Sequence, residues 1–327
     1  MERQYVALVA ETSDGPAPAL AFRTLDARPP QAGEVVVRVD ASALNYKDGL
    51  ALTGRGKILR KSPMTPGVEF AGTIVDSSDP AWPAGKAVQA FGWGIGERFD
   101  GGYARYVHAK TEWLEARDGF TAEEAMAFGI PGVTAMWSIM RLRANGLRDG
   151  GTVVVTGAGG GVGSVAILLL AHLGYRPVAV SGRPELDDYF KSLGATSTVS
   201  RESILASAKP LEKEAWDGAI ENVGGDVLAK LLPQMKYGSS VALVGNAAGI
   251  NFTATVFPFI LRAVNLLGID SVALPMATRA RIWAEAAKLP REKLRAIVET
   301  VNLADVQAAA ARIVDGKTRG RVVVRVS

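Results

Sequence analysis

A glycine-rich turn between an apolar run and an apolar helical pattern constrains the fold of this chain most strongly. Residues 156–164 read TGAGGGVGS, follow the β-branched run at 152–155 and lead into the apolar segment 164–173. A strand, a glycine turn and a helix in this order form the phosphate-binding unit of doubly wound α/β sheets. Glycines let the backbone approach a pyrophosphate, and the helix N-terminus offers N–H groups to the anion. The segment predicts a dinucleotide site, although such a turn also occurs in plain strand–helix packing.

The end of the next predicted strand indicates which dinucleotide is bound. Residues 175–180 read as that strand, and Ser-Gly-Arg follows at 181–183 without a carboxylate. Enzymes that prefer NAD usually carry an acidic residue here for the ribose 2′-hydroxyl, whereas an arginine suits a 2′-phosphate. Arg201, just past another apolar stretch, is expected to add a second positive charge. The end of this strand therefore predicts that NADPH is the cofactor. In the alternative interpretation, Arg183 is a solvated loop residue and Glu185 contacts the ribose.

The composition fits a soluble globular protein. The 327 residues are 48% hydrophobic and 21% charged, with a net charge of +4, which suggests about two domains. The slight positive charge suits phosphate-rich ligands, but no basic block interleaved with aromatic residues favours nucleic acid. No signal peptide or bilayer-length apolar run is evident. We therefore expect a cytoplasmic protein without membrane or nucleic-acid partners.

The scarcity of cysteine and histidine limits the chemistry. The chain has no cysteine and two histidines, His108 in an apparent strand and His172 in the helix after the glycine turn. Disulfides, thiol catalysis and cysteine-ligated zinc or iron–sulfur sites are thereby excluded. The histidines lie far apart in sequence without a nearby ligand partner, so both are predicted to be structural and no metal site is expected.

The chain changes character near residue 121. Before it, strand-like runs alternate with proline and glycine turns, which is typical of a β-rich domain. A Thr-Ala-Glu-Glu capping box at 121–124 then starts a helix, and strands alternate with helices from 152 to about 270. This alternation predicts a doubly wound parallel sheet. In the β-rich part we predict strands at 5–9, 34–39 and 69–75.

The end of the chain is predicted to return to the β-rich domain. Residues 321–326 form one more apolar run, which is expected to pair with strands of that domain. The fold class is therefore α/β, with a Rossmann doubly wound parallel sheet inserted in a β-rich substrate domain. We expect the Rossmann domain at residues 123–271 and the substrate domain at 1–122 plus 272–327.

Several longer motifs narrow the family. They are LNYKDGLALTGRGK at 44–57, PGVEFAG at 66–72, GWGIGE at 92–97, VFPFILR at 256–262 and LGIDS at 267–271. The domain order makes the chain similar to the medium-chain dehydrogenase/reductase superfamily over essentially its whole length. The motifs together resemble, more narrowly, the acrylyl-CoA reductase family of that superfamily. The resemblance implies a GroES-like fold for the β-rich domain. Because Gly-Val-Glu at 67–69 replaces the Gly-His-Glu of zinc-dependent members, the chain is similar to the zinc-independent, quinone-reductase-like branch.

The resemblance implies an NADPH-dependent enzyme that reduces acryloyl-CoA to propanoyl-CoA. Hydride transfer to the β-carbon of a 2-enoyl thioester leaves an enolate, and a proton then reaches the α-carbon. Tyr46 is the candidate that positions the reactants or donates this proton, with water as the alternative donor. Asn45 and Asp48 are expected to orient Tyr46 or to bind the nicotinamide end, although Asp48 equally fits a residue that simply starts a turn or helix.

The resemblance also implies which residues contact the cofactor. They are Tyr46, Gly159, Gly160, Gly161, Val162, Ser181, Gly182, Arg183, Arg201, Asn246, Ile260 and Ser271. Asn246 departs from the family, which tends to be apolar there, and its backbone is expected to reach the nicotinamide. Residues 96–102 and 129–134 also depart from the family pattern, and both could line the acyl pocket.

A local positive cluster and an apolar segment suggest further partners. Arg55, Lys57, Arg60 and Lys61 lie close together in sequence, and the phosphates of coenzyme A would be their natural partner, with a solvated loop as the alternative. Edge strands near 256–267 commonly pair across a dimer axis in the superfamily, so the resemblance implies a homodimer. The alternative functions are an NADPH-dependent quinone or general enone reductase and a non-catalytic NADPH-binding protein.

Overall fold

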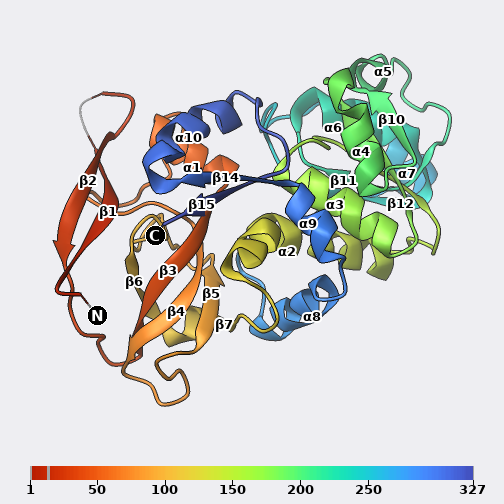
Figure 1. Ribbon diagram of the computed structural model, residues 1–327. Coiled ribbons are helices and arrows are strands. Elements are labelled where there is room, and N and C mark those ends of the chain that lie inside the picture. The colour runs from red at the N-terminus through yellow and green to blue at the C-terminus, as the bar shows by residue number, and fades with distance from the viewer. Residues whose placement is uncertain (1, 13–14, 327) are drawn as a thin grey trace. The chain divides into compact units, whose positions relative to one another are not determined.

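The computed structural model describes residues 2–12 and 15–326 (Figure 1). It divides into two compact units. The first, here called the mixed-sheet unit, comprises Met1–Ile130 and Leu294–Ser327, and the second, the parallel-sheet unit, comprises Pro131–Lys293. The first unit is therefore discontinuous in sequence. The expected boundaries of the functional domains, after residues 122 and 271, stay a prediction.

One sheet organises the mixed-sheet unit around its long strand β3 (Glu34–Leu44). The strand order is β14-β15-β3-β4-β5-β7, and β6 also pairs with β3. Val35, Val37 and Val39 of β3 alternate along the strand and are buried together in the core of this unit. The strand β3 pairs antiparallel with β15, β4 and β6. The other strands are β4 (Glu69–Ser77), β5 (Ala87–Phe91), β6 (Tyr106–Lys110), β7 (Glu115–Ala116), β14 (Val298–Asn302) and β15 (Arg321–Arg325).

A hairpin and two packed helices complete this unit. The strands β1 (Gln4–Glu11) and β2 (Ala19–Asp26) pair antiparallel, with Gln4 opposite Asp26. Helix α1 (Tyr46–Thr53) packs against α10 (Val306–Val314). A Cβ atom on Gly49 would lie 2.6 Å from a methyl carbon of Ile313, so glycine allows the close approach of the two helices.

The predicted return of the chain end is confirmed. The strand β15 pairs antiparallel with β3, and Val322 lies opposite Leu44. On its other side β15 pairs parallel with β14. The last segment of the chain is thus an inner strand next to the edge strand β14, and it lies beside β3, the strand that leads into α1.

Six strands form the sheet of the parallel-sheet unit in the order β10-β9-β8-β11-β12-β13. All neighbours pair parallel, as predicted. The strand order reverses between β8 and β11, which is the place where doubly wound sheets bind their ligands. The strands are β8 (Thr152–Val155), β9 (Arg176–Ser181), β10 (Ser197–Ser200), β11 (Trp216–Glu221), β12 (Met235–Leu243) and β13 (Asn265–Gly268).

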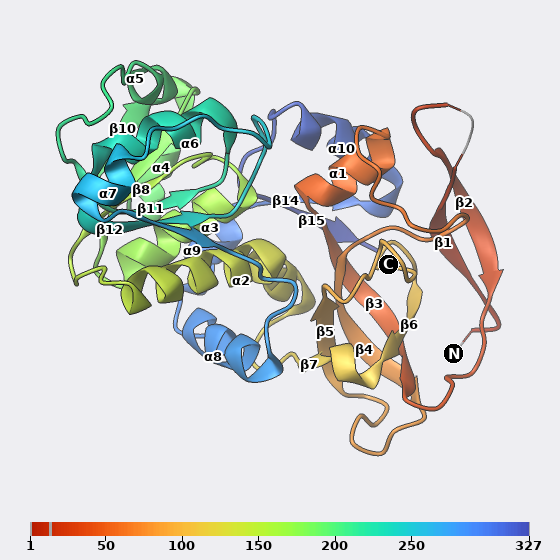
Figure 2. The same ribbon diagram turned by 180° about the vertical axis from the view of Figure 1, so that it is seen from behind.

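Helices connect these strands, and α3 is buried most completely. Residues 163–170 of α3 are all buried, as expected for a helix that is apolar on every side. Figure 2 shows α7 beside β12 at one edge of the sheet. The helices are α3 (Gly161–His172), α4 (Asp187–Leu193), α5 (Arg201–Leu205), α6 (Gly225–Leu231), α7 (Phe257–Arg262) and α8 (Met276–Ala286), and α9 (Arg291–Ala296) spans the limit of the unit.

The helix α2 (Ala122–Ala144) is broken near its middle. Its start is the predicted capping box, in which the Thr121 N–H donates to the Glu124 carboxylate and the Glu124 N–H donates to the Thr121 hydroxyl. Gly129 then leaves the helical conformation with φ 46° and ψ −154°. By length and composition alone α2 could cross a membrane, but 78% of its apolar window is buried inside the structure, which is the pattern of a core helix.

Candidate cofactor and substrate sites

The glycine turn follows β8 and leads directly into α3, as predicted. The Gly160 N–H donates to the Gly157 carbonyl over 2.9 Å, and Gly160 caps the helix. A Cβ atom on Gly163 would lie 2.4 Å from the Gly157 carbonyl oxygen, so only glycine lets the helix approach the turn this closely. The first N–H groups of a helix have no partner inside it. They are the donors that a pyrophosphate needs at this position.

Two guanidinium groups frame the carboxyl end of β9. A Cβ atom on Gly159 would lie 2.5 Å from Arg183 Nη2, and one on Gly182 would lie 3.2 Å from Arg201 Cζ. The Arg183 N–H also donates to the Ser181 hydroxyl over 3.0 Å. The structure therefore brings both predicted arginines to the strand tip beside the glycine turn. Such a pair fits a 2′-phosphate better than a ribose hydroxyl.

Polar groups join the ends of β8 and β11 at the point where the strand order reverses. Glu221 Oε1 accepts hydrogen bonds from the Thr156 hydroxyl and the Val223 N–H, both at 2.9 Å, and burial raises the pKa of this carboxyl. The side-chain amide of Asn222 donates to the Thr156 carbonyl over 2.7 Å. Asn222 Oδ1 is buried without a partner among the described residues. An acceptor left open at this edge fits a ligand with a donor group.

Glu221 and Asn222 were not predicted as site residues from the sequence. The sequence does contain a clue, because a Glu-Asn pair ends an apolar strand. Polar residues at the carboxyl ends of such strands often contact ligands, and this pair lies next to the glycine turn in space. The spatial neighbourhood of β8 and β11, which are 65 residues apart at Thr156 and Glu221, was the missing information.

Ser271 lies in an anchored loop after β13. Its hydroxyl lies 2.7 Å from the Thr134 hydroxyl, and both residues are buried. The fully buried Arg279 donates to the carbonyls of Val272 at 2.7 Å and Leu274 at 3.2 Å. Arg279 therefore fixes the backbone that follows Ser271.

Gly161 and Val162 are the first two residues of α3, whereas two other predicted cofactor residues of this unit, Asn246 and Ile260, lie in different surroundings. Asn246 follows β12, and a Cβ atom on its neighbour Gly245 would lie 2.2 Å from the Asn222 carbonyl oxygen. The loops after β11 and β12 thus touch, and Asn246 lies at the carboxyl edge of the sheet. Ile260 lies instead on α7 and is 68% exposed.

In the mixed-sheet unit, Asp48 caps the start of α1 from a buried position. Its carboxylate accepts the Asn45 N–H at 2.9 Å and the Val68 N–H at 3.0 Å. Burial, with a smaller contribution from the nearby Glu69 carboxylate, raises the pKa of Asp48 to about 7 against the lowering effect of its hydrogen bonds. These contacts are those of a helix-start residue, and the raised pKa means that Asp48 holds a proton far more readily than an exposed aspartate.

The side chain of Asn45 is engaged by a buried ion pair. Its amide N–H donates to Glu69 Oε1 over 2.7 Å, and its Oδ1 accepts from Arg321 Nη1 over 2.9 Å. Arg321 Nη2 pairs with Glu69 Oε1 at 2.7 Å, and both side chains are buried, at 2% and 0% exposure. These contacts fix the Asn45 side chain at the start of α1, directly before Tyr46.

The ion pair also organises the break in α2. Glu69 Oε2 accepts the Ile130 N–H over 2.8 Å. A Cβ atom on Gly129 would lie 2.4 Å from this same oxygen, so the position requires glycine. Glu69 and Arg321 were not predicted from the sequence as partners of Asn45. In the sequence, Arg321 stands out only as an arginine at the first position of an apolar strand.

Tyr46 is the first residue of α1 and is 37% exposed. Its hydroxyl forms no hydrogen bond within residues 2–12 and 15–326. The residues on either side of it are fixed, because Asn45 is held by the ion pair and Lys47 pairs with Glu97 at 2.7 Å. A phenol on a fixed backbone can contact a ligand without first leaving another partner.

The predicted basic cluster is partly neutralised. Arg55 and Lys61 each pair with an aspartate, over 2.7 and 3.2 Å. Lys57 and Arg60 form no ion pair with any residue that the structure describes. Two of the four cations are thus available to an external anion.

Comparison with known proteins identifies the family. Residues 31–117 match the alcohol dehydrogenase GroES-like domain, and residues 161–289 match the zinc-binding dehydrogenase family. The chain belongs to the medium-chain dehydrogenase/reductase superfamily. It is 50% identical to "Acrylyl-CoA reductase AcuI" of Ruegeria pomeroyi, over 90% of this chain and 91% of that protein. It is 46% identical to "Probable acrylyl-CoA reductase AcuI" of Escherichia coli, over 98% and 99%.

Solved structures of this superfamily show the same fold. The yhdH oxidoreductase from Salmonella enterica, crystallised in complex with NADP, has a TM-score of 0.93 and 46% identity, and the match covers 99% of this chain and 100% of that chain. The predicted α/β fold, a GroES-like domain with a Rossmann-type parallel sheet, is thereby confirmed. The predicted resemblance to acrylyl-CoA reductases is confirmed as well.

The zinc ligands of this superfamily are not reproduced here. The chain has no cysteine, and among residues 2–12 and 15–326 no group of three or more His, Asp or Glu side chains could hold a metal. His108 Nε2 instead lies 2.9 Å from the Arg28 carbonyl oxygen, and His172 ends α3.

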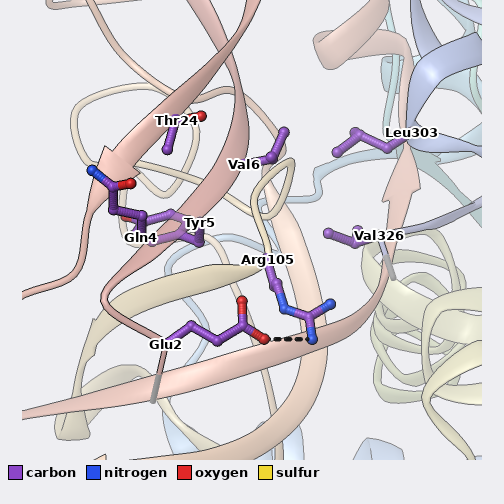
Figure 3. Close-up of a pocket in the computed structure, with 8 residues that line it drawn as sticks. All are labelled: Glu2, Gln4, Tyr5, Val6, Thr24, Arg105, Leu303 and Val326. Atoms are coloured by element: carbon purple, nitrogen blue, oxygen red, sulfur yellow. Dashed lines mark hydrogen bonds and ion pairs between the residues drawn. The ribbon is translucent and has the colours of Figure 1, made fainter.

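A small cavity in the mixed-sheet unit holds none of the predicted site residues. It measures about 280 Å³ and lies beside β1, where Tyr5, Val6 and Leu303 line it (Figure 3). An ion pair of 3.1 Å between Glu2 and Arg105 lies at its edge. Neither Tyr46 nor Glu69 lines this cavity.

Proposed function

We propose that this chain catalyses the NADPH-dependent reduction of acryloyl-CoA to propanoyl-CoA. The observation that carries the proposal is the 50% identity, over 90% of the chain, to a protein named acrylyl-CoA reductase. A relationship this close over both domains usually preserves the reaction class, and the arginine pair at the end of β9 suits the phosphorylated dinucleotide.

The residues present fit NADPH. The glycine turn supplies the pyrophosphate site, Arg183 and Arg201 with Ser181 supply the 2′-phosphate site, and Asn222 offers an unpaired acceptor at the carboxyl edge. When bound, the nicotinamide supplies a hydride to the β-carbon of the enoyl group. Two solved relatives, from Salmonella enterica and E. coli, were crystallised with NADP and NADPH.

Tyr46 is the residue proposed to contact the reactants in the mixed-sheet unit. Its phenol orients the thioester or donates the proton that the α-carbon receives, since a phenol can donate without a large shift in its pKa. Asn45 and Asp48 hold the backbone on which Tyr46 lies. We assign them to positioning rather than to direct contact.

The available cations of the basic cluster are proposed to bind coenzyme A phosphates. Lys57 and Arg60 are the first candidates, since Arg55 and Lys61 already have carboxylate partners. A phosphate could also draw these two away from their exposed aspartates, because exposed ion pairs contribute little free energy.

The sheet edge at β13 supports a homodimer. The neighbouring α7 segment leaves Val256, Phe257, Ile260 and Leu261 between 42% and 68% exposed. An apolar patch beside an edge strand is typical of an interface. We propose a cytoplasmic homodimer that uses this edge, and light scattering after gel filtration would measure its mass.

The decisive experiment follows NADPH oxidation with acryloyl-CoA, crotonyl-CoA and a simple quinone in parallel. Turnover with acryloyl-CoA at a far higher kcat/KM than with the quinone is expected. The second candidate is a quinone or general enone reductase, because the chain is also 42% identical to the putative quinone oxidoreductase YhfP of Bacillus subtilis. Turnover of the quinone alone would select it, and tight NADPH binding without any turnover would indicate a non-catalytic protein.

A further inference from the structure

The turn after β5 holds an aromatic residue in a strained backbone conformation. Trp93 has φ 55° and is one of two non-glycine residues with positive φ within residues 2–12 and 15–326. Its neighbours Gly92 and Gly94 have φ 78° and 85°, which glycine adopts without strain. Bulky residues avoid this region, and such strain persists only where the surroundings fix it, often at ligand sites.

Backbone hydrogen bonds hold this turn closed. The Ile95 N–H donates to the Gly92 carbonyl over 2.9 Å, and the Arg98 N–H donates to the Gly94 carbonyl over 2.8 Å. The side chain of Ile95 is buried in the core of the mixed-sheet unit. Trp93 therefore cannot relax unless the turn opens and Ile95 leaves the core.

The same turn is fixed to both segments that carry the candidate catalytic residues. A Cβ atom on Gly96 would lie 2.7 Å from the Gly67 carbonyl carbon, so the turn lies directly against the segment that leads to the buried ion pair. Glu97 pairs with Lys47 at 2.7 Å, which ties the turn to the residue after Tyr46. The strained indole thus belongs to the neighbourhood of α1 and β4.

Core packing does not account for the strain. Trp93 is 37% exposed, the same as Tyr46, whereas Phe91, two residues earlier, is buried. The fold holds a large aromatic side chain in an unfavourable backbone conformation and leaves a third of it accessible. This combination indicates a surface that a ligand meets.

We propose that Trp93 forms a fixed wall of the acyl subsite and limits the length of the 2-enoyl chain that is reduced. The proposal rests on the proposed function. A tryptophan side chain has only two torsion angles, and here the backbone that carries it is fixed. The indole therefore moves little when the acyl chain of the substrate is longer. The acryloyl group has no substituent on its β-carbon and fits against such a wall. Longer 2-enoyl thioesters place carbon atoms where the indole lies.

The test measures kcat/KM for acryloyl-CoA, crotonyl-CoA and 2-hexenoyl-CoA. Trp93→Ala removes the indole, and Trp93→Gly also removes the backbone strain. Phe22→Ala is the matched control, because Phe22 is an exposed aromatic residue of the same unit, at 49%, and lies on β2 of the hairpin. Both Trp93 variants are expected to raise the ratio of kcat/KM for hexenoyl-CoA to that for acryloyl-CoA roughly tenfold or more, since a methylene group that a pocket excludes is worth about 10- to 200-fold. Phe22→Ala should leave the ratio unchanged.

An unchanged ratio in both Trp93 variants, with the dissociation constant for NADPH intact, overturns the proposal. Trp93→Gly also keeps the test valid if Trp93→Ala folds poorly, because glycine fits the observed φ. If the wild-type protein reduces enones but not acryloyl-CoA, the proposed function fails. The same ratio is then measured with alkenones of increasing length, which tests Trp93 separately. A wild-type protein that reduces neither series overturns both proposals.

Discussion

Arg321 and Glu69 form a buried ion pair of 2.7 Å although 252 residues separate them in the chain. The pair is surrounded by partners that satisfy its remaining groups. Arg321 also donates to the carbonyls of Met126 at 2.8 Å and Ala127 at 3.2 Å. This one contact joins the last strand, β4 and the break in α2, and through Asn45 it fixes the start of α1.

Removing one partner of this pair is expected to destabilise the protein strongly. Arg321→Met leaves the Glu69 carboxylate buried without its cation, which costs about 3–5 kcal/mol of unfolding free energy in comparable cases. Urea unfolding followed by circular dichroism measures the loss. The double variant Arg321→Met with Glu69→Gln should recover part of it, since no buried charge then stays unpaired. Equal losses in the single and double variants would contradict this account.

The sequence predicted what depends on local pattern and missed what depends on distant contacts. The glycine turn, the six strands of the parallel sheet and the return of β15 follow from short apolar runs and their order. The partners of Asn45 could not be predicted, because Arg321 looks like any arginine at a strand end until β15 is placed beside β3. The break at Gly129 was hidden for the same reason, since Glu69 makes it necessary.

Asp48 should make stability depend on pH. Burial raises its pKa from 3.8 to about 7, so between these values the folded protein keeps a proton that the unfolded chain releases. The unfolding free energy therefore falls as pH rises from about 4 to about 7 and levels off above that. Asp48→Asn is expected to flatten this part of the curve, and urea titrations at several pH values measure it. Asp188→Asn, at an exposed aspartate on α4, should keep the slope of the wild type.

The arginine pair at the end of β9 should determine the choice of cofactor. Arg183→Ala and Arg201→Ala each remove charge-assisted hydrogen bonds to a 2′-phosphate, worth about 1.5–3 kcal/mol, and should weaken NADPH binding by roughly 10- to 150-fold. NADH affinity should change little. Fluorescence titration with both nucleotides measures the effect. Arg176→Ala, at the exposed opposite end of the same strand, is the control. If NADH binding and NADPH binding weakened equally, the arginines would not be responsible for recognising the 2′-phosphate.

The basic cluster should act on the coenzyme A part of the substrate alone. Charge reversal at Lys57 and Arg60 is expected to raise the KM for acryloyl-CoA several-fold, more at low salt than at high salt, because exposed charges are screened. Acryloyl-N-acetylcysteamine, which lacks the nucleotide phosphates, serves as the control substrate, and its KM should not change. A KM for acryloyl-CoA that is indifferent to the reversal would leave the cluster as a solvated loop.

Tyr46→Phe separates proton donation from positioning. If the phenol donates the proton, its removal should lower kcat about 100-fold or more, which is the usual contribution of a general acid. The dissociation constant for NADPH should stay unchanged, since the ring and the backbone of α1 are kept. Tyr237→Phe, at a tyrosine that is 73% exposed, is the matched control. A Tyr46→Phe variant with wild-type kcat would assign the proton to water, and a raised KM with unchanged kcat would assign Tyr46 to substrate binding.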